Sequence, residues 1–537
     1  MNLPFLTIDL IIHNARIFDP LKGFIQPTAL ATSSGRILAL GSDQEILSLQ
    51  NASSQVINAG GKLLLPAFTD SHTHYWKYVQ RQMEVNLEDC HSLQETLSRI
   101  RKKVQESPAG SWITGGGWDY NLWPAGEFPH RLQLDEISTR HFIALDSKDW
   151  HTCWVNSPVL KQVGIALDKP YPGAKQLALH PVTGEFTGLL EEQVRLAVFD
   201  LLPKWDYTRL QSSYPKVLKQ YYRCGITAVH SMETPAEFRV SQEARIRNQL
   251  GIRIFWYFPY QLIDHAKALA IGEGVGDDFI RICGVKMFVD GAFGSQSAEL
   301  LENYDQLGHA GTEVMTESEL REAVAAANAS RLSCAIHAIG DRAVQKTLRV
   351  LGQFHLQSRQ YGLRHRIEHA QLIQSQDIPL FKKHQIYASL QPVHLAYDIP
   401  VIEKYLSNRA QLTYPFGDLK KQGATLLFGS DIPVEDFNPW LAIYTAIERK
   451  YLFRLEEPSF FPEQKLDLLT CLQAYTINPA EVAGMAHCLG RISEGMLADF
   501  FLCNQNIFNV PSEQIKETCS VLTVIAGKIV YQNFGGK

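Results

Sequence analysis

The stretch that decides the fold is residues 63–74, which read Leu-Leu-Leu-Pro-Ala-Phe-Thr-Asp-Ser-His-Thr-His. Its apolar half has the length of a buried strand, and polar residues follow it directly. His72 and His74 are two positions apart, so in an extended chain their imidazoles share one face. Neutral imidazole is the commonest metal ligand among side chains. The stretch therefore predicts a strand whose end carries two candidate metal ligands.

Seven further apolar runs share this form, because each ends in polar or glycine residues. Helical patterns separate most of the runs, for example at residues 316–330 and 342–352. Strands that alternate with helices predict a parallel sheet, and eight such units predict a closed (β/α)8 TIM barrel, an α/β fold. The eight predicted strands are residues 63–70, 225–230, 253–258, 285–290, 333–337, 366–369, 386–391 and 425–431.

An insertion of about 150 residues separates the first two predicted strands. We place it at about residues 76–220, with helical patterns at 93–105 and 210–224 and a strand pattern at 142–145. It leaves the barrel at the end of a strand, where the active site of this fold lies. We therefore expect the insertion to cap the active site.

Both ends of the chain are rich in short strands and turns. Residues 521–531, for example, predict a hairpin that turns at Gly527 and Lys528. Each end is too small to form a core of its own. We therefore predict one composite β-sandwich domain, residues 1–62 with 485–537, beside a barrel domain at 63–484. A separate domain at each end is the weaker alternative.

The composition is that of a globular protein with a large core. Of 537 residues, 45% are hydrophobic and 20% charged, and the formal net charge is -5. Without a basic stripe, nucleic acid is excluded as an expected partner. No apolar run approaches the roughly 18 residues of a membrane helix, the start does not resemble a signal peptide, and the nine cysteines lack a C-x-x-C spacing. We expect a cytoplasmic protein that acts on a small molecule; a homo-oligomer is left open.

Candidate metal ligands recur at the ends of the predicted strands. Because these ends face one pocket in a barrel, the residues there are expected to converge. One histidine in an apolar strand is more often a packing residue, but four histidines, a lysine and an aspartate at strand ends are difficult to explain by packing. Besides His72 and His74, the candidates on strands four, five, six and eight are Lys286, His337, His369 and Asp431.

The segments around these strand ends resemble the amidohydrolase superfamily, and most closely its YtcJ-like branch, which includes the N-substituted formamide deformylases. The resemblance covers nearly the whole chain. One departure is Gln296, where many relatives have an arginine, and this puts the preference for an anionic substrate group in doubt. The resemblance rests on residues 66–74, 285–295, 336–341, 367–371, 391–392 and 429–434.

The resemblance implies a metal centre with one or two divalent cations. His72 and His74 would bind the more buried ion, and His337 and His369 the more exposed one. Lys286 would be carbamylated and bridge the two, and Asp431 would serve as ligand and general base. An unmodified ammonium only donates hydrogen bonds and repels a cation, whereas a carbamate is anionic. The alternative for Lys286 is an ordinary ion-paired lysine. Zinc suits a histidine-rich site best, with manganese or iron as alternatives.

Three residues are candidate substrate contacts. Trp118 follows three glycines that match the same branch, and the alternative there is a flexible turn. His151 lies in a stretch that approaches the pocket in the resembling family; packing, or a helix start near Asn156, is the alternative. Gln391 belongs to a segment that fits the branch.

The sequence thus predicts a metal-dependent amidohydrolase that cleaves a C–N amide-type bond, for example in an N-substituted formamide. Deamination or ester hydrolysis at the same metal site is one alternative, and a catalytically silent metal-binding scaffold is another. No ligand is missing, and the retained Asp431 argues against the silent scaffold. The additional histidines His230, His365 and His394 are interpreted as structural or supporting residues.

Overall fold

The computed structural model contains two compact units. The barrel unit comprises Met1–Trp76 and Pro215–Lys537, and the insertion unit comprises Lys77–Tyr214. The structure describes residues 7–124, 127–147, 152–165, 177–179, 186–191, 195, 197–198, 201–202, 205–452 and 456–534. Among these residues, no helix has both the length and the apolar character needed to span a membrane.

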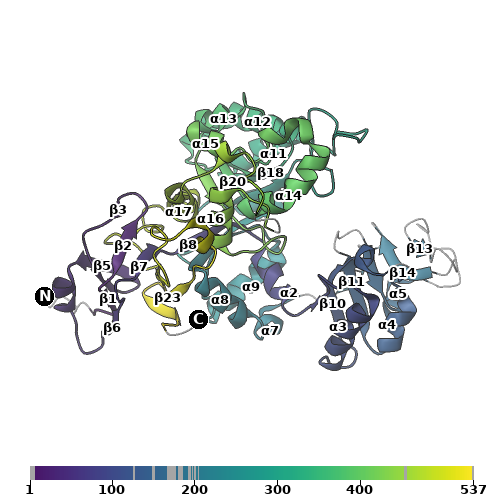
Figure 1. Ribbon diagram of the computed structural model, residues 1–537, viewed down its shortest axis with the longest axis horizontal. Helices are drawn as coiled ribbons and strands as arrows, with labels where there is room; N and C mark the ends of the chain where they lie inside the picture. Colours follow the sequence, from purple (N-terminus) through teal and green to yellow (C-terminus); the bar gives the residue numbers. More distant parts are fainter. Residues whose placement is uncertain are drawn as a thin grey trace. The chain divides into compact units, whose positions relative to one another are not determined.

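The centre of the barrel unit is an eight-stranded parallel sheet (Figure 1). The sheet closes between its first and last strands, because the Asp431 amide donates to the His72 carbonyl over 2.7 Å and the His74 amide to the Ile432 carbonyl over 2.9 Å. The predicted (β/α)8 TIM barrel is therefore confirmed. In sheet order its strands are β21 (Leu426–Phe428), β20 (Tyr387–Leu390), β19 (Arg366–His369), β18 (Ser333–Ala338), β17 (Ile280–Phe288), β16 (Arg253–Pro259), β15 (Ile226–Ser231) and β8 (Phe68–Thr73).

Helices follow the barrel strands, as the alternating pattern predicts. The predicted helix at 316–330 is α11, which begins after a capping box between Thr316 and Glu319. The predicted helix at 342–352 is longer in the structure, where it forms α12. The helices of the barrel region are α9 (Pro235–Ile246), α10 (Ile263–Ala268), α11 (Glu317–Ala329), α12 (Asp341–Gln360), α13 (Ile378–His384), α14 (Pro392–Tyr405), α15 (Phe416–Lys421), α16 (Pro439–Glu448), α17 (Leu468–Tyr475) and α18 (Ile477–Val482).

The first predicted strand, 63–70, is divided between two sheets. β7 (Leu63–Pro66) pairs with strands outside the barrel, and β8 belongs to the barrel. The change occurs at Ala67, whose amide donates to the Asp499 carbonyl, whereas the next amide, that of Phe68, donates to the Gly225 carbonyl in the barrel. One apolar run thus joins both parts of the unit.

Strands from the two chain ends form a β-sandwich beside the barrel. The hydrophobic core between its two sheets contains Leu10 and Ile12 from one sheet and Leu64, Phe500 and Leu502 from the other. One sheet has the order β5 (Arg36–Gly41), β4 (Ala29–Ser33), β1 (Leu10–His13), β6 (Gln55–Asn58); the other has β24 (Lys528–Gln532), β23 (Ser520–Ile525), β22 (Phe500–Cys503), β7, β2 (Arg16–Asp19), β3 (Gly23–Phe24).

Two features of the sandwich bear on the sequence predictions. The C-terminal hairpin turns through Ala526 and Gly527, both with positive φ, one residue earlier than predicted. Because β7 lies in the sandwich, this sheet extends beyond residue 62; the domain boundaries at 62 and 485 stay a prediction. Short helices α1 (Asp43–Leu47) and α19 (Ser512–Ile515) accompany these sheets.

The insertion unit has its own six-stranded sheet and its own core, which includes Trp118, Trp123 and Trp154. The predicted helix at 93–105 is α3 (Leu93–Gln105), and the predicted strand at 142–145 lies in β11 (Phe142–Ser147). The capping role of this insertion stays a prediction. Its other elements are β9 (Val85–Asn86), β10 (Trp112–Trp118), β12 (Thr152–Val155), β13 (Leu177–Leu179), β14 (Phe186–Glu191), α4 (Arg131–Ile137), α5 (Ser157–Val163) and α7 (Tyr207–Leu210), while α2 (Tyr75–Arg81) and α8 (Tyr214–Arg223) adjoin the boundaries between the units.

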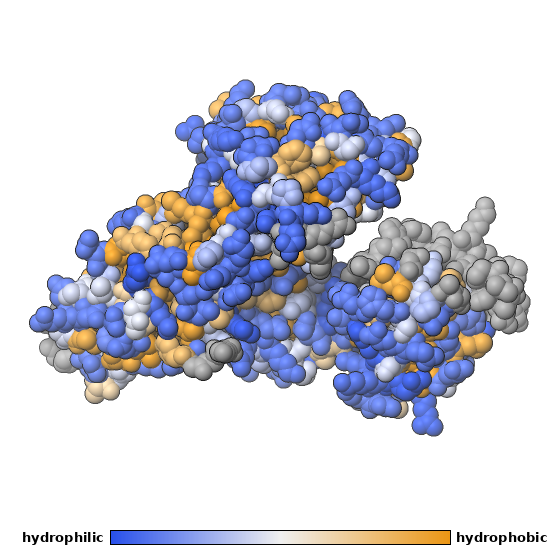
Figure 2. Space-filling model, viewed as in Figure 1, coloured by the Kyte–Doolittle hydropathy of each residue, from blue (hydrophilic) through white to orange (hydrophobic). Residues whose placement is uncertain are grey.

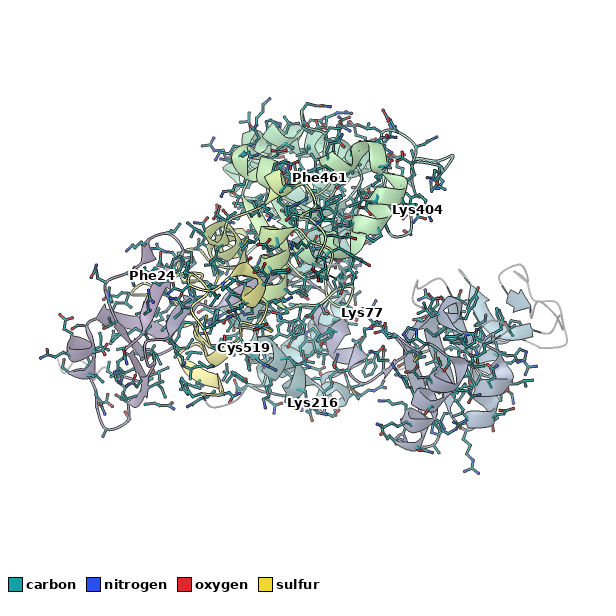
Figure 3. The ribbon with its side chains drawn as sticks, in the orientation of Figure 1. Phe24, Lys77, Lys216, Lys404, Phe461 and Cys519 are labelled. Carbon is teal, nitrogen blue, oxygen red and sulfur yellow. The ribbon has the colours of Figure 1, made fainter. Side chains whose placement is uncertain are left out.

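Hydrophilic residues cover most of the barrel helices on the face drawn in Figure 2. Lys404, labelled in Figure 3, lies near the end of α14, on the outer side of the barrel. The apolar side chains lie mainly in the core, as expected for a barrel packed by its helices.

Candidate metal centre

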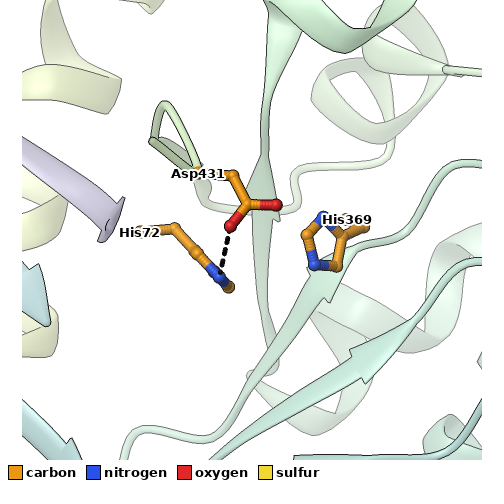
Figure 4. Close-up of side chains that lie close together, drawn as sticks. All are labelled: His72, His369 and Asp431. Carbon is orange, nitrogen blue, oxygen red and sulfur yellow. Dashed lines mark ion pairs between the residues drawn. The ribbon is translucent and has the colours of Figure 1, made fainter. Parts of the chain in front are cut away.

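Three buried side chains at one end of the barrel bring possible metal ligands together. One ligand atom from each of His72, His369 and Asp431 lies within 4.8 Å of the corresponding atoms of the other two (Figure 4). His72 is in β8, His369 ends β19, and Asp431 follows β21. His72 Nε2 is 3.3 Å from Asp431 Oδ1. Three strand ends therefore converge on one point, as the sequence predicts.

The backbone at two of these residues has an uncommon conformation. His369 has a φ of 72° and Asp431 a φ of 60°, values that residues with a side chain seldom adopt. In a regular strand Glu368 and His369 would face opposite sides of the sheet. The turn of the backbone at His369 lets both side chains approach His72. Strain of this kind collects at functional sites.

All six predicted ligands line one cavity of about 470 Å³. His74 Nε2 lies 3.4 Å from Asp431 Oδ1, and Lys286 Nζ lies 3.4 Å from His72 Nε2. The rings of His337 and His369 are 4.5 Å apart between centroids. The structure thus brings the predicted residues together; their individual roles as ligands stay a prediction.

The ionisation of these residues fits a divalent cation. Burial lowers the pKa of His337 to about 3 and that of His369 well below its usual range, so both imidazoles are neutral, the form that ligates. Burial alone would raise the pKa of Asp431, but His72 and His74 outweigh it and hold that pKa well below its usual range. His369 Nδ1 is buried and has no hydrogen-bond partner among the described residues. Neutral imidazoles beside a carboxylate are a typical zinc donor set.

Lys286 is buried in the barrel next to His72. Burial lowers the pKa of this lysine to about 8, which increases the share of neutral amine near neutral pH. Within the described part of the chain, no carboxylate oxygen lies within 4.0 Å of its Nζ. The charges of Glu368 and Asp431 act in the opposite direction and raise the pKa of Lys286, so both the carbamylated lysine and an ordinary charged lysine stay predictions.

Glu368 is a site residue that the sequence reasoning missed. Its Oε2 lies 2.5 Å from His72 Nδ1, and Arg366 contacts it from the other side. Burial alone would raise the pKa of Glu368, but Arg366 and His72 hold it well below its usual range. The available signal was a charged pair at alternate positions of an apolar strand, which places both residues on the inner face.

The remaining cavity wall is partly apolar and partly acidic. His394, interpreted from sequence as structural or supporting, lines the cavity, and its Nε2 lies 3.9 Å from Asp431 Oδ2. His230 and His365 are buried and bonded within the barrel, His230 to Arg366 and His365 to Ser358. The wall residues that the sequence did not single out include Phe288, Phe293, Ile339, Gln371, Asp398, Val434 and Glu435.

The three predicted substrate contacts have different outcomes. Trp118 is 2% exposed in the core of the insertion unit, where its indole N–H donates to the Leu145 carbonyl, which favours a packing role for the ring. Gln391 is buried just before α14 and is not among the described residues that line the cavity. His151 lies outside the described residues. Substrate contact by these residues stays a prediction. Gln296, the departure noted in the sequence, lies in the loop after β17, and its side-chain amide donates to the Gly294 carbonyl.

Comparison with known proteins places this site in context. The model of the amidohydrolase family matches residues 55–531. The chain is 31% identical to Protein LONG AFTER FAR-RED 3 of Arabidopsis thaliana, over 97% of this chain and 91% of that protein. It is 25% identical to the putative amidohydrolase YtcJ of Bacillus subtilis, over 97% and 99%, and 22% identical to the N-substituted formamide deformylase of Arthrobacter pascens, over 98% and 99%.

A solved structure has the same overall fold. The crystal structure of an uncharacterized metal-dependent hydrolase from Pyrococcus furiosus aligns with a TM-score of 0.78 and 25% sequence identity. The alignment covers 93% of this chain and 99% of that one. The resemblance that the sequence motifs predict is thereby confirmed over nearly the whole chain.

Proposed function

Because the chain belongs to the amidohydrolase family of metal-dependent hydrolases, we propose that it hydrolyses the C–N bond of a small amide-type substrate. The observation that carries this proposal is the cavity lined by His72, His74, Lys286, His337, His369 and Asp431. An N-substituted formamide is the favoured substrate type, since one relative along nearly the full length is named a formamide deformylase.

We assign the ligands as the family resemblance implies. His72 and His74, with Asp431, would hold one divalent cation, and His337 and His369 would hold a second, with zinc as the favoured metal. Lys286, once carbamylated, would supply the bridging anion, and its Nζ lies 3.4 Å from His72 Nε2. A bound divalent cation supplies Lewis-acid polarisation and lowers the pKa of water from about 15.7 to about 7.

Asp431 is the proposed general base. It is ionised in the fold and lies beside both histidines of the first pair. Asp431 takes a proton from the attacking water at a carboxylate oxygen. As the C–N bond breaks, the same oxygen returns the proton to the nitrogen of the leaving amine, so that an acid and an amine are released.

The wall of the cavity suits a substrate with an apolar substituent. Phe288 and Val434 are exposed at the cavity, and Phe293 lines it. Apolar walls with a few polar groups are typical of small-molecule sites. We retain Trp118, His151 and Gln391 as proposed contacts to the substrate.

We further propose that the protein works in the cytoplasm on a small molecule. All nine cysteines are free, and seven of them are buried. Unpaired cysteines are typical of a reducing compartment.

The test is turnover of a substrate panel by protein reconstituted with zinc. The panel contains N-substituted formamides, larger amides, esters and amino-purines, and amine and acid release are measured. We expect turnover of formamides or amides, and its loss in Asp431→Asn, which cannot accept the proton. Turnover confined to esters or amino-purines would show that the bond class is wrong. A fully metallated, folded protein that turns over nothing in the panel would favour the silent scaffold.

A further inference from the structure

The buried carboxylate of Glu368 links His72 to an arginine in the barrel interior. Glu368 Oε2 lies 2.5 Å from His72 Nδ1. On its other side Arg366 Nη2 donates to Oε2 over 2.9 Å, and Arg366 Nε donates to Oε1. All three side chains are at most 1% exposed. A guanidinium is protonated at every pH that a folded protein meets, so the ion pair keeps Glu368 an anion.

We propose that Arg366 and Glu368 are positioning residues that hold the His72 ring in one tautomer and one orientation for a metal cation. Glu368 and Asp431 are both carboxylate anions that only accept hydrogen bonds, but the Glu368 contact is the shorter, at 2.5 Å against 3.3 Å, so we place the His72 proton on Nδ1 and the lone pair on Nε2. That Nε2 faces the cavity, between Asp431 Oδ1 at 3.3 Å and Lys286 Nζ at 3.4 Å. A carboxylate on the far nitrogen also makes an imidazole a more basic ligand.

Arg366 is itself fixed by three other barrel strands. Its Nη2 donates to the Ser71 carbonyl in β8 over 2.5 Å and to Ser389 Oγ in β20 over 2.8 Å. Its Nη1 lies 2.9 Å from His230 Nδ1 in β15. The orientation of His72 is thus fixed through contacts with four barrel strands. A metal ligand that must be held within a few tenths of an ångström needs support of this kind.

A contribution to protein stability does not explain why the Arg366–Glu368 ion pair is buried in the barrel. Burial of an ion pair carries a desolvation cost that apolar residues of similar volume avoid, and such replacements are often neutral or stabilising. Elsewhere the barrel interior contains apolar residues such as Phe255, Cys283 and Ala335. The contact with His72 therefore gives this charged pair a role that an apolar replacement could not fill.

The test is metal affinity in the full-length protein, so it depends on the metal site and not on the substrate. Metal-free wild type, Glu368→Gln and Asp499→Asn are titrated with cobalt(II), whose visible spectrum reports ligand geometry. Asp499 is the matched control, because its carboxylate forms an equally buried pair with Arg253, whereas its other hydrogen bonds come from Thr227 and the Ala526 amide and not from a predicted metal ligand. We expect Glu368→Gln to bind cobalt about 10- to 100-fold more weakly and with an altered spectrum. Asp499→Asn should keep wild-type affinity and spectrum, even where its melting temperature falls.

Two outcomes would overturn the proposal. One is wild-type affinity and spectrum in Glu368→Gln; the other is an equal loss of affinity in the Asp499→Asn control. If Glu368→Gln does not fold, the cobalt titration is carried out on Ser389→Ala instead. This variant removes one neutral hydrogen bond from Arg366. An affinity loss of about two- to tenfold supports the proposal, and unchanged affinity contradicts it.

Discussion

Two buried arginine–carboxylate pairs in the barrel unit have the same chemistry but different neighbours. In the first pair Glu368 lies between Arg366 and His72 and contacts both side chains. In the second, Asp499 accepts from Arg253 Nε over 2.7 Å and Nη2 over 2.8 Å, and from the Ala526 amide over 2.8 Å. The first pair contacts a candidate metal ligand, whereas the second joins barrel strand β16 to the turn between sandwich strands β23 and β24.

The difference teaches that burial and charge alone do not reveal what an ion pair is for. Both carboxylates are at most 3% exposed, and both receive two bonds from one guanidinium. Their other contacts separate them, because Glu368 contacts an imidazole whereas Asp499 accepts from the Ala526 amide and the Thr227 hydroxyl. Changes at the metal site should therefore alter metal binding and activity. Changes at the Arg253–Asp499 pair, called the framework pair below, should alter stability.

The largest effect is expected for Lys286→Ala. A pair of metal ions about 3.5–4 Å apart normally needs a bridging anion, and the carbamylated lysine is the group best placed to provide it. The variant should lose at least one metal ion and most activity, with partial recovery of both when a short carboxylic acid is added. Metal analysis and turnover provide the measurement.

Full metal content and near-normal turnover in Lys286→Ala would rule out Lys286 as a ligand. A mononuclear site of His72, His74 and Asp431, with His337 or His369 as a further ligand, would then replace the binuclear one. The difference between the two ion pairs would still hold, because Glu368 contacts His72 whether the site binds one metal ion or two.

The next effect concerns the framework pair. Asp499→Ala leaves Arg253 buried without its partner, and breaking a buried pair in this way costs about 3–5 kcal/mol. The free energy of unfolding, measured with denaturant, should fall by that amount, while cobalt affinity of the folded protein stays at the wild-type level. A loss of metal affinity without a loss of stability would reverse the roles given to the two pairs.

A smaller effect on stability is expected for Gly429→Ala, at the point where the barrel closes beside His72. A Cβ on Gly429 would lie 2.5 Å from the His72 backbone nitrogen, a distance that forces the strands to shift. Gly429→Ala should lower the free energy of unfolding by about 1–3 kcal/mol and also weaken metal binding. Gly308→Ala is the control, because a Cβ there meets no atom within 4 Å. Equal behaviour of the two variants would count against a tightly held His72.

The smallest effect is expected for His151→Ala in the insertion. If His151 contacts the substrate, its loss removes about one hydrogen bond, worth about 0.5–1.5 kcal/mol. Values of kcat/KM should fall unequally across the substrate panel, with metal content unchanged. Equal losses for all substrates, together with loss of metal, would show that His151 serves the metal site instead.

The sequence predicts the barrel and the grouping of the candidate ligands for a physical reason. Apolar runs with polar ends are a local signal, and a closed barrel converts the ends of separate runs into neighbours. His72, Lys286 and His337 could therefore be grouped before any contact was known. The structure places all of them at one cavity.

The missed features depend on information that single residues do not carry. Glu368 and His369 are adjacent, and both approach His72 only because the positive φ of His369 overrides the alternation of a strand. His394, which the sequence analysis interprets as a structural or supporting residue, comes from helix α14 and lines the cavity. The division of the first run at Ala67 depends on which partner each backbone amide finds, although the run itself is continuously apolar.

The most direct test of the central claim is metal removal and return on one preparation of the protein. The claim is that a metal centre held by His72, His74, Lys286, His337, His369 and Asp431 is required for hydrolysis, and that Glu368 only positions His72. Dialysis against a chelator should abolish turnover of the best panel substrate while the melting curve still shows a folded protein. Stoichiometric zinc should then restore the activity. Undiminished turnover by protein shown to be free of metal would contradict the account.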